Sequence, residues 1–316
     1  MENNHAKLLN NIEENIASCI LGKSNEVKLL MTALLAGGHV LIEGVPGTGK
    51  TMLIKALAKT IQSDFRRVQC NPDLLPTDIT GFSIYHPKDE RFVFTPGPIL
   101  TNILLVDEIN RASTKTQSAL LEAMEEKQVT VDGKIHALPQ PFFVMATQNP
   151  IEFEGTYLLP EAQLDRFMMK LHLDYPERQT EKKLLLSQGM KRPIDEISPV
   201  TDMSTIESIQ QYIQSTHVAE SVVDYILSIV EATRNHDSIF LGVSPRGTLA
   251  LIQAVKGLAL INQRDFATPD DVKFLIPYVF NHRIILHTEA QMRGDTVDNI
   301  MQSIVDGVHV PKRLEK

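Results

Sequence analysis

Gly44-Val45-Pro46-Gly47-Thr48-Gly49-Lys50-Thr51 is the stretch that decides the fold of this 316-residue chain. The apolar run 39–42 before it predicts a buried strand, and residues 52–58 after it have the spacing of an amphipathic helix. A strand, a glycine-rich turn and a helix in this order form the context that the P-loop pattern requires. Glycines let successive backbone N–H groups surround phosphate oxygens, because no side chain stands in the way. The sequence therefore predicts a nucleoside triphosphate site.

The residues of this loop have separate expected roles. Lys50 is expected to reach the β- and γ-phosphates, and the helix that begins near it adds the positive end of its dipole. The hydroxyl of Thr51 is expected to bind Mg²⁺. The predicted phosphate-binding residues are Gly44, Val45, Pro46, Gly47, Thr48, Gly49, Lys50, Thr51 and Met52.

A second motif supplies the carboxylates that such a site needs. The fully apolar run 103–106 leads directly into Asp107 and Glu108. A buried parallel strand places these residues at its C-terminal end, where the ligands of open α/β sheets gather. We expect Asp107 to hold Mg²⁺ through water and Glu108 to polarise the water that attacks the γ-phosphate.

Three further segments complete the expected sheet. Residues 65–70, 142–147 and 168–173 have the apolar or alternating character of strands. Asn149, at the tip of the second of these, is expected to lie level with Asp107 and to orient the attacking water. Five strands with helices between them predict an α/β fold, a P-loop NTPase αβα sandwich built on a five-stranded parallel sheet.

Two hairpins and two helices are expected outside this sheet. Residues 91–98 read as one arm of a small hairpin, and Asp132-Gly133 is a strong two-residue turn signal within 129–136. The segment with Ile20 and Leu21 joins two helices just before the P-loop strand, and we expect it to pack against the adenine.

The remainder of the chain is expected to be helical. Lys191-Arg192-Pro193 and Ser198-Pro199 favour a boundary, which divides the chain into a nucleotide-binding core, 1–192, and a small all-α lid domain with its own core, 193–316. Helices are expected at 206–213, 219–236, 248–263 and 270–281. A turn at 242–247 interrupts them and carries Arg246.

Composition limits the function classes. The net charge is −8, and the basic residues occur as short pairs such as Arg66-Arg67, which usually lie on solvated faces. A nucleic-acid partner is therefore not expected. No apolar run has the length of a membrane span and the first residues do not form a signal peptide, so we expect a cytoplasmic protein. The two cysteines, Cys19 and Cys70, are expected to be buried rather than bridged.

Taken together, these motifs resemble the MoxR family of AAA+ ATPases over nearly the whole chain. The P-loop and Asp107-Glu108 alone indicate only an ATPase. The more specific blocks are residues 105–112, 146–150, 159–167 and Ser244-Pro245-Arg246.

The resemblance implies further roles. Asn149 matches the sensor 1 residue, Arg166 matches an arginine finger that reaches the γ-phosphate in a neighbouring subunit, and Arg246 matches sensor 2 on the lid. Asp165 is expected to tether Arg166 locally. Residues 82–98 and 129–136 correspond to the two inserts that are candidates for moving a client. The resemblance also implies ATP and Mg²⁺ as cofactors, an ATP-promoted ring of six subunits, partners with von Willebrand factor A domains and a chaperone-like part in maturing other complexes.

Three alternatives remain open at this stage. Related AAA+ branches include nucleic-acid motors and metal-chelatase motor subunits, which have similar inserts. The chain could also be a nucleotide-gated scaffold that hydrolyses little ATP.

Overall fold

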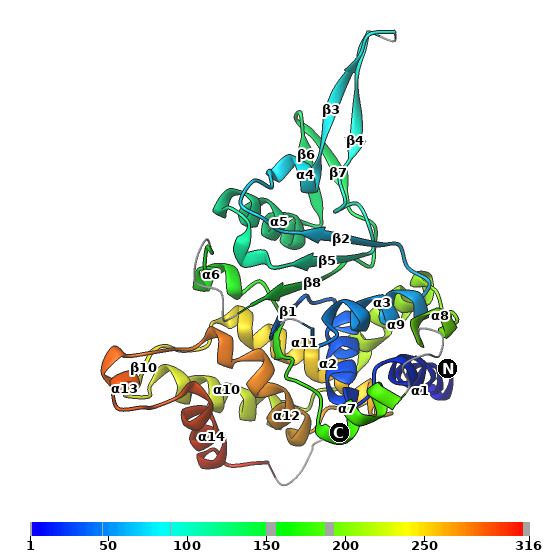
Figure 1. Cartoon of the computed structure of the whole chain (residues 1–316). Coiled ribbons are helices and arrows are strands. Elements are labelled where there is room, and N and C mark those ends of the chain that lie inside the picture. Colours follow the sequence, from blue (N-terminus) through cyan, green and yellow to red (C-terminus); the bar gives the residue numbers. More distant parts are fainter. Residues whose placement is uncertain (1, 46, 89, 150–155, 187–192, 312–316) are drawn as a thin grey trace.

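The computed structural model describes residues 2–45, 47–88, 90–149, 156–186 and 193–311 (Figure 1). Pro46 of the predicted phosphate-binding loop lies outside the described residues.

A five-stranded sheet forms the centre of the molecule. Its strands pair in the order β2-β5-β8-β1-β9, and every pairing is parallel. Their bounds are β1 (Val40–Glu43), β2 (Phe65–Gln69), β5 (Ile103–Asp107), β8 (Phe143–Gln148) and β9 (Met169–His172). The predicted P-loop NTPase sheet is therefore confirmed. Because β8 lies between β1 and β5, the ends of all three strands meet at the edge where the P-loop begins.

Both faces of the sheet are buried, as expected for parallel strands that read as continuous apolar runs. Val40, Ile42 and Leu105 point to one face and belong to a buried cluster with α1 (Glu2–Cys19), α2 (Ser24–Leu35) and α3 (Lys50–Thr60). Leu41, Leu104 and Val106 point to the other face and pack with α4 (Pro76–Thr80), α5 (Thr114–Glu126) and the 3-10 turn η1 (Ile109–Arg111). Successive side chains of a strand alternate between faces, so each strand contributes to both clusters.

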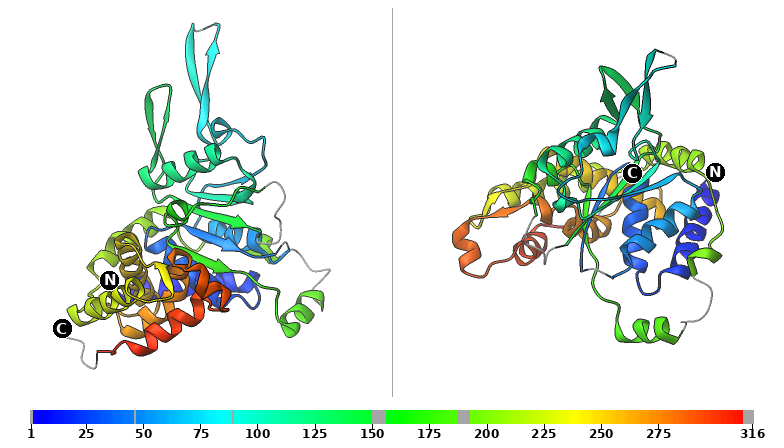
Figure 2. Two further views of the ribbon diagram at one scale, coloured as in Figure 1. Left: turned by 90° about the vertical axis from the view of Figure 1, so that its left-hand side faces the viewer. Right: turned by 45° about the horizontal axis from the view of Figure 1, so that its top comes forward.

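Two antiparallel hairpins project from the α5 side of the sheet (Figures 1 and 2). The longer consists of β3 (Gly81–His86) and β4 (Arg91–Pro96), and the shorter of β6 (Gln128–Val131) and β7 (Lys134–Ala137). The shorter turns at Asp132 and Gly133, whose φ angles are 51° and 74°. Two consecutive positive φ values define the two-residue turn that Asp-Gly predicts.

The C-terminal part is mainly helical and packs against α2. Its elements are α9 (Met203–Tyr212), η2 (Ile213–Ser215), α10 (Glu220–Arg234), α11 (Pro245–Ile261), α12 (Pro269–Val279), η3 (Asn281–Arg283), α13 (Thr288–Met292) and α14 (Val297–Gly307). Short helices α7 (Arg178–Leu186) and α8 (Pro193–Glu196) lie between β9 and this part in the sequence, and α6 (Glu161–Leu164) precedes β9. A helical lid following the sheet is as predicted.

The separate core that we expected for the lid is not present. One buried cluster runs without interruption from β1 and α2 into α10, α11 and α12. A Cβ atom at Gly257 of α11 would lie 3.1 Å from the carbonyl oxygen of Thr32 in α2, so the two helices approach closely. Hydrophobic contacts cross the expected boundary at residue 192, and the division into two domains there stays a prediction.

The lid also contains a small sheet that the sequence did not reveal. The strands β10 (Ile239–Leu241) and β11 (Ile285–Leu286) pair antiparallel. Strands of three and two residues are too short to show alternation. Among the described residues, no helix combines the length and the apolar character needed to cross a membrane.

Candidate nucleotide site

The P-loop adopts a conformation that depends on its glycines. Gly47 and Gly49 have φ angles of 84° and 88°, a region that residues with side chains rarely adopt. Gly44 is required for a different reason, since a Cβ atom there would lie 2.5 Å from the carbonyl oxygen of Leu173. Directly after Gly49, Lys50 begins α3, so the N–H groups of the first turn of the helix adjoin the loop.

The Lys50 ammonium lies against the loop itself. Its Nζ donates to the carbonyl oxygens of Gly44, at 2.5 Å, and Val45, at 3.0 Å. Burial lowers the pKa of Lys50, and the charges of Asp107 and Glu108 oppose that effect. To reach a phosphate, Lys50 would exchange two neutral acceptors for anionic oxygens, which form stronger hydrogen bonds with an ammonium.

The carboxylate of Asp107 is buried and held from two sides. Oδ2 accepts a 2.6 Å hydrogen bond from Nε of Arg67, and Oδ1 accepts one of 3.2 Å from the hydroxyl of Thr147. The same hydroxyl accepts from the backbone N–H of Glu108 at 2.9 Å. Three strands, β2, β5 and β8, thus fix the orientation of Asp107. The sequence suggested that Arg67 lies on a solvated face, but the structure shows that it bonds to Asp107.

Glu108 lies beside Asp107 but has a different backbone conformation. Its φ angle is 57°, in the left-handed region that few glutamates adopt. Oε2 accepts from Nε2 of Gln69 at 2.8 Å and lies 3.3 Å from Nε of Arg111. The change of backbone direction after β5 separates the two neighbouring carboxylates, so they can have different partners.

Asn149 is buried and follows β8 immediately. The backbone N–H of Gly44 donates to the carbonyl oxygen of Gln148 at 3.3 Å, so Asn149 continues the chain next to the start of the P-loop. The structure thus brings Lys50, Asp107, Glu108 and Asn149 to one edge of the sheet.

Ile20 and Leu21 lie between α1 and α2, at the same edge of the sheet. Ile20 packs on the core, whereas Leu21 is exposed. Nζ of Lys23, two residues later, donates to the carbonyl oxygen of Asp174 at 3.1 Å, and Leu173 adjoins Gly44. Met52, also exposed, lies in the first turn of α3.

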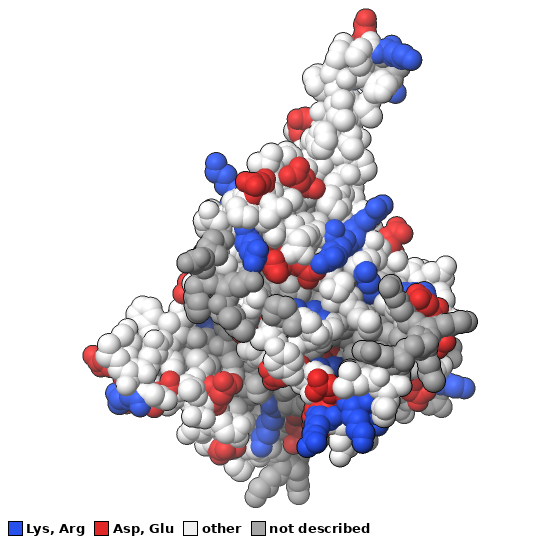
Figure 3. Space-filling model, in the orientation of Figure 1, with Lys and Arg blue, Asp and Glu red and all other residues white. Residues whose placement is uncertain are grey.

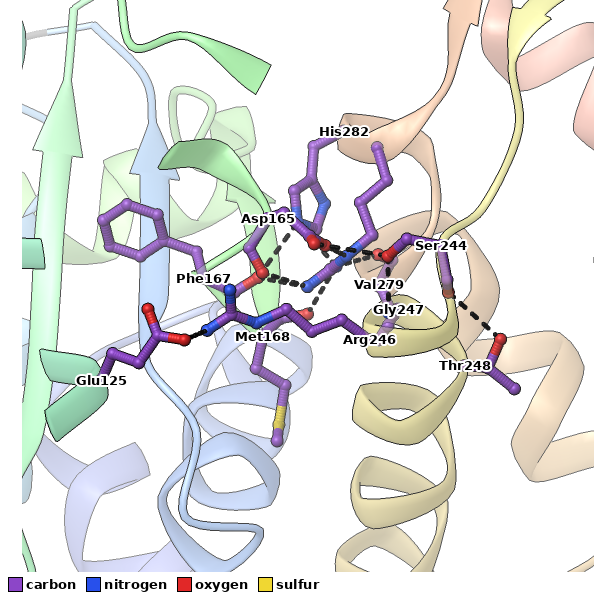
Figure 4. A network of polar contacts seen from close by, with 11 residues as sticks. Glu125, Asp165, Phe167, Met168, Ser244, Arg246, Gly247, Thr248, Val279 and His282 are labelled. Carbon is purple, nitrogen blue, oxygen red and sulfur yellow. Dashed lines mark hydrogen bonds and ion pairs between the residues drawn. The ribbon is translucent and has the colours of Figure 1, made fainter. Parts of the chain in front are cut away.

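Arg166 and Arg246 lie elsewhere, in a separate pocket. Nε of Arg166 is 3.2 Å from Oε2 of Glu125. Nη2 of Arg246 is 2.8 Å from Oε1 of the same carboxylate (Figure 4). Both arginines line an open pocket together with Gly37 and Gly38.

This arginine pocket and the P-loop are at opposite ends of β1. Gly37 and Gly38 precede the strand, and the P-loop follows it. At about 3.3 Å per residue, the six residues from Gly38 to Gly44 span roughly 20 Å. The two predicted arginines therefore come together with each other and not with the P-loop of their own chain.

The partner of Asp165 differs from our expectation. Its carboxylate does not tether Arg166 but pairs with Nε of Arg283 at 2.6 Å and accepts from the hydroxyl of Ser244 at 3.3 Å. Sequence reasoning missed Arg283 and Glu125, because each contacts residues at least 40 positions away. A lone arginine next to His282, in a segment without a recognisable motif, gives no signal of such a contact.

Comparisons with known proteins agree with this geometry. Residues 39–169 match the ATPase family associated with various cellular activities (AAA), and residues 231–304 match the AAA lid domain. Chaperone MoxR1 of Mycobacterium tuberculosis is 38% identical over 302 residues, which cover 93% of this chain and 80% of that protein. The chain belongs to the MoxR family of AAA+ ATPases.

Other relatives match nearly the whole chain. YeaC of Bacillus subtilis is 50% identical to this MoxR-family protein over 304 residues, which are 96% of this chain and 95% of YeaC. A crystal structure of a candidate ATPase from Cytophaga hutchinsonii superposes with a TM-score of 0.91 at 36% identity, covering 98% of this chain and 97% of that one.

Proposed function

We propose that this MoxR-family protein binds ATP with Mg²⁺ and hydrolyses it to ADP and phosphate at a site shared between two copies of the chain. The observation that carries the proposal is the separation within one protomer. The P-loop and the two carboxylates lie at one end of the sheet, and Arg166 and Arg246 lie at the other. A head-to-tail arrangement of identical chains would bring the two ends together, as in a closed ring.

The P-loop end would bind the nucleotide. N–H groups of the loop and of the first turn of α3 would surround the phosphates, with the Lys50 ammonium on the outer ones. The hydroxyl of Thr51 and the carboxylate of Asp107 are oxygen donors of the kind that Mg²⁺ prefers, so these residues fit the ion. When bound, Mg²⁺ neutralises charge on the phosphate oxygens.

Glu108 would be the base in this site. Gln69 and Arg111 orient its carboxylate, and the buried amide of Asn149 follows the adjacent strand β8. A water between Glu108 and the γ-phosphate would give up a proton as it attacks. Ile20, Leu21 and Met52 would contact the nucleoside, because they lie at the same edge.

The opposite end would supply positive charge to a neighbour's nucleotide. Two guanidinium groups share one half-exposed carboxylate, that of Glu125. An arriving γ-phosphate carries more negative charge than a single carboxylate and offers three oxygens to the planar guanidinium groups. Arg166 would act as the arginine finger, and Arg246 would carry the nucleotide state to the lid.

The hairpins make protein clients a better fit than nucleic acid. The β3–β4 hairpin exposes the apolar side chains of Phe82, Ile84, Tyr85, Phe92 and Val93. Figure 3 shows that its shaft is largely free of Lys and Arg on the visible face. A nucleic-acid surface would need a basic stripe. We therefore propose a chaperone-like remodeller, working in the cytoplasm as a ring of six, with partners that contain von Willebrand factor A domains.

A dilution series tests the shared site. Specific ATPase activity is expected to rise with protein concentration and to reach a plateau when the chains have assembled, because an isolated protomer lacks its finger. Light scattering on the same samples gives the assembly state. Equal specific activity in monomeric and assembled samples would refute the shared site.

A second experiment tests the partner class. Glu108→Gln is expected to retain ATP and to hold partners that the active protein releases. Identification of co-purifying proteins by mass spectrometry, with Lys50→Ala as the matched control that lacks nucleotide, should enrich proteins with von Willebrand factor A domains. Equal recovery with both variants would count against that part of the proposal.

A further inference from the structure

We propose that Arg283, through Asp165, is a positioning residue that holds Arg166 and Arg246 as one unit for the neighbour's nucleotide. The inference rests on the proposed function, because it concerns the same two arginines. Arg283 also lines the arginine pocket, but its side chain is only 3% exposed and its guanidinium is bonded to protein groups, so its role would be indirect.

Arg283 joins the lid to the segment that carries Arg166. Arg283 lies in η3 of the lid, and its guanidinium donates to the Asp165 carboxylate at 2.6 Å. The same guanidinium also donates to three backbone carbonyl oxygens of segment 165–168 (Figure 4). These belong to Asp165, at 3.0 Å, Phe167, at 2.8 Å, and Met168, at 3.2 Å. Arg283 also donates to the carbonyl oxygen of Val279 in its own lid. Arg166 therefore lies between two residues, Asp165 and Phe167, that both accept hydrogen bonds from the Arg283 guanidinium.

Asp165 joins the same segment to the helix that carries Arg246. Its second carboxylate oxygen accepts from the hydroxyl of Ser244 at 3.3 Å. Ser244 is the N-cap of α11, where its hydroxyl accepts from the backbone N–H of Gly247 at 3.1 Å. Arg246 is the second residue of this helix. One carboxylate thus links the segment of Arg166 to the helical turn of Arg246.

The packing around Arg283 leaves no room for another side chain at Gly247. A Cβ atom there would lie 2.8 Å from Cδ of Arg283 and 2.9 Å from Cγ1 of Val243. The first turn of α11 is therefore pressed against the stem of Arg283. A change in the lid position moves η3, segment 165–168 and the α11 N-terminus together, so both arginines would reach or leave the neighbour's phosphate at the same time.

A complementation experiment separates this role from a merely structural one. In the proposed site, Glu108→Gln has a defective catalytic end but an intact arginine end, and Arg166→Ala has the reverse. Mixing these two variants under conditions of subunit exchange is expected to restore ATPase activity. In a random equal mixture, about one interface in four joins two intact ends.

Arg283→Met is expected to behave as Arg166→Ala does. Alone it should lose turnover by about 10- to 100-fold with little change in KM, since a displacement of about 1 Å at a catalytic group has an effect of this size. Mixed with Glu108→Gln it should regain activity. Mixed with Arg166→Ala it should show no gain in activity, because every arginine end is then defective.

The opposite pattern would overturn the inference. If Arg283→Met recovers with Arg166→Ala and not with Glu108→Gln, Arg283 supports the catalytic end of its own chain. If it recovers with neither variant, Arg283 supports the fold of its own chain. If a mixture of Glu108→Gln and Arg166→Ala does not regain ATPase activity, the proposed shared site is wrong. That result can be told apart from a failure of the Arg283 inference alone, in which this mixture does regain activity.

Two further variants keep the test decisive. Asp165→Asn keeps the shape of the side chain but loses its charge. This variant should show the same complementation pattern as Arg283→Met, and it replaces Arg283→Met in the test if that protein does not fold. Arg264→Met is the matched control. Arg264 makes a two-pronged contact with the buried Asp271, at 2.7 and 2.6 Å, within the lid alone. Its loss should leave the turnover of the assembled protein close to that of the wild type.

Discussion

The two ends of the central sheet differ in how their charges are balanced. At the P-loop end, strands hold each group in place: β2, β5 and β8 fix the Asp107 carboxylate, and Lys50 bonds to two carbonyl oxygens of its own loop. At the arginine end, two guanidinium groups share the carboxylate of Glu125, which is 38% exposed. Ion pairs between partly exposed groups contribute little stability, so this end can change partners at low cost.

This difference indicates which end moves. At the P-loop end, side chains from neighbouring parallel strands hold the Asp107 carboxylate. The arginine end combines a segment before β9 with the first turn of a lid helix, and the Asp165 carboxylate links the two through Ser244 and Arg283. We therefore expect substitutions at the arginine end to affect turnover only in the assembled protein. Substitutions at the P-loop end should affect the nucleotide site of the chain that carries them.

The largest expected effect is that of Arg166→Ala. It should reduce turnover in the assembled protein by about 10³- to 10⁵-fold, the range for arginine fingers in other NTPases. ATP affinity of the isolated protomer should not change, because Arg166 is distant from its own P-loop. Steady-state ATPase and nucleotide-binding measurements check both parts. Arg293→Ala, an exposed lid arginine, is the control, and a protomer that loses ATP binding with Arg166→Ala would contradict the separation of the two ends.

Glu108→Gln should have the next largest effect. Loss of a general base is expected to lower turnover by about 10²- to 10⁴-fold while ATP binding is retained. Equilibrium binding of a fluorescent ATP analogue, with ATPase assays in parallel, measures the two properties. Glu289→Gln on α13 is the matched control. Undiminished hydrolysis in Glu108→Gln would show that the base lies elsewhere.

The third prediction concerns acid, which should lower the stability of the folded chain through His39. His39, directly before β1, is buried; its Nδ1 accepts from the backbone N–H of Val144 at 3.1 Å, and Nε2 lies 3.3 Å from the carbonyl oxygen of Met124, next to Glu125. Burial lowers the pKa of His39 to about 4. The unfolded chain takes up this proton near pH 6.5 and the folded chain only near pH 4. Stability present above pH 6.5 is therefore lost as the pH falls towards 4, by on the order of 3 kcal/mol.

Denaturation at a series of pH values between 4 and 7 measures this loss. His39→Gln should unfold more easily at neutral pH but show a smaller decrease across the range, because the buried titrating group is absent. His86→Gln, on the exposed β3–β4 hairpin, is the control. An unchanged decrease in His39→Gln would show that another group determines the acid sensitivity.

The smallest expected effect is that of Glu125→Gln. Each partly exposed ion pair is worth about 0.2–1 kcal/mol, so removing the charge should free the arginines and raise activity about two- to fivefold at protein concentrations below full assembly. The adjacent Glu126→Gln is the control. A fall in activity would mean that Glu125 positions the arginines for catalysis and does not compete for them.

The sequence predicted the P-loop end better than the arginine end. The five strands were predicted because each is a continuous or alternating apolar run, and the Asp-Gly turn of the shorter hairpin was predicted because two positive φ values favour these residues. These signals are local. The roles of Lys50, Asp107, Glu108 and Asn149 were predicted from the P-loop and from the strand ends that carry them, and they stay predictions, although the structure places all four at one edge.

Contacts between distant segments gave no such signal. Arg67 looked like part of a solvated pair but bonds to Asp107, 40 positions later, and Arg283 bonds to Asp165, 118 positions earlier. The partners of such arginines depend on how the strands and helices pack, and no local pattern encodes this. For the same reason, the sequence did not indicate that Arg166 and Arg246 share one glutamate.

The stack between the two hairpins has a mechanical consequence. The ring of Phe94 in β4 lies on that of His136 in β7, with centroids 3.9 Å apart and planes inclined by 23°. A pull on the longer hairpin therefore also loads the shorter one, whose first strand begins two residues after the end of α5. Glu125 is in the last turn of that helix. A force on a polypeptide bound to the longer hairpin would then also move α5, and with it the Glu125 carboxylate that pairs with Arg166 and Arg246.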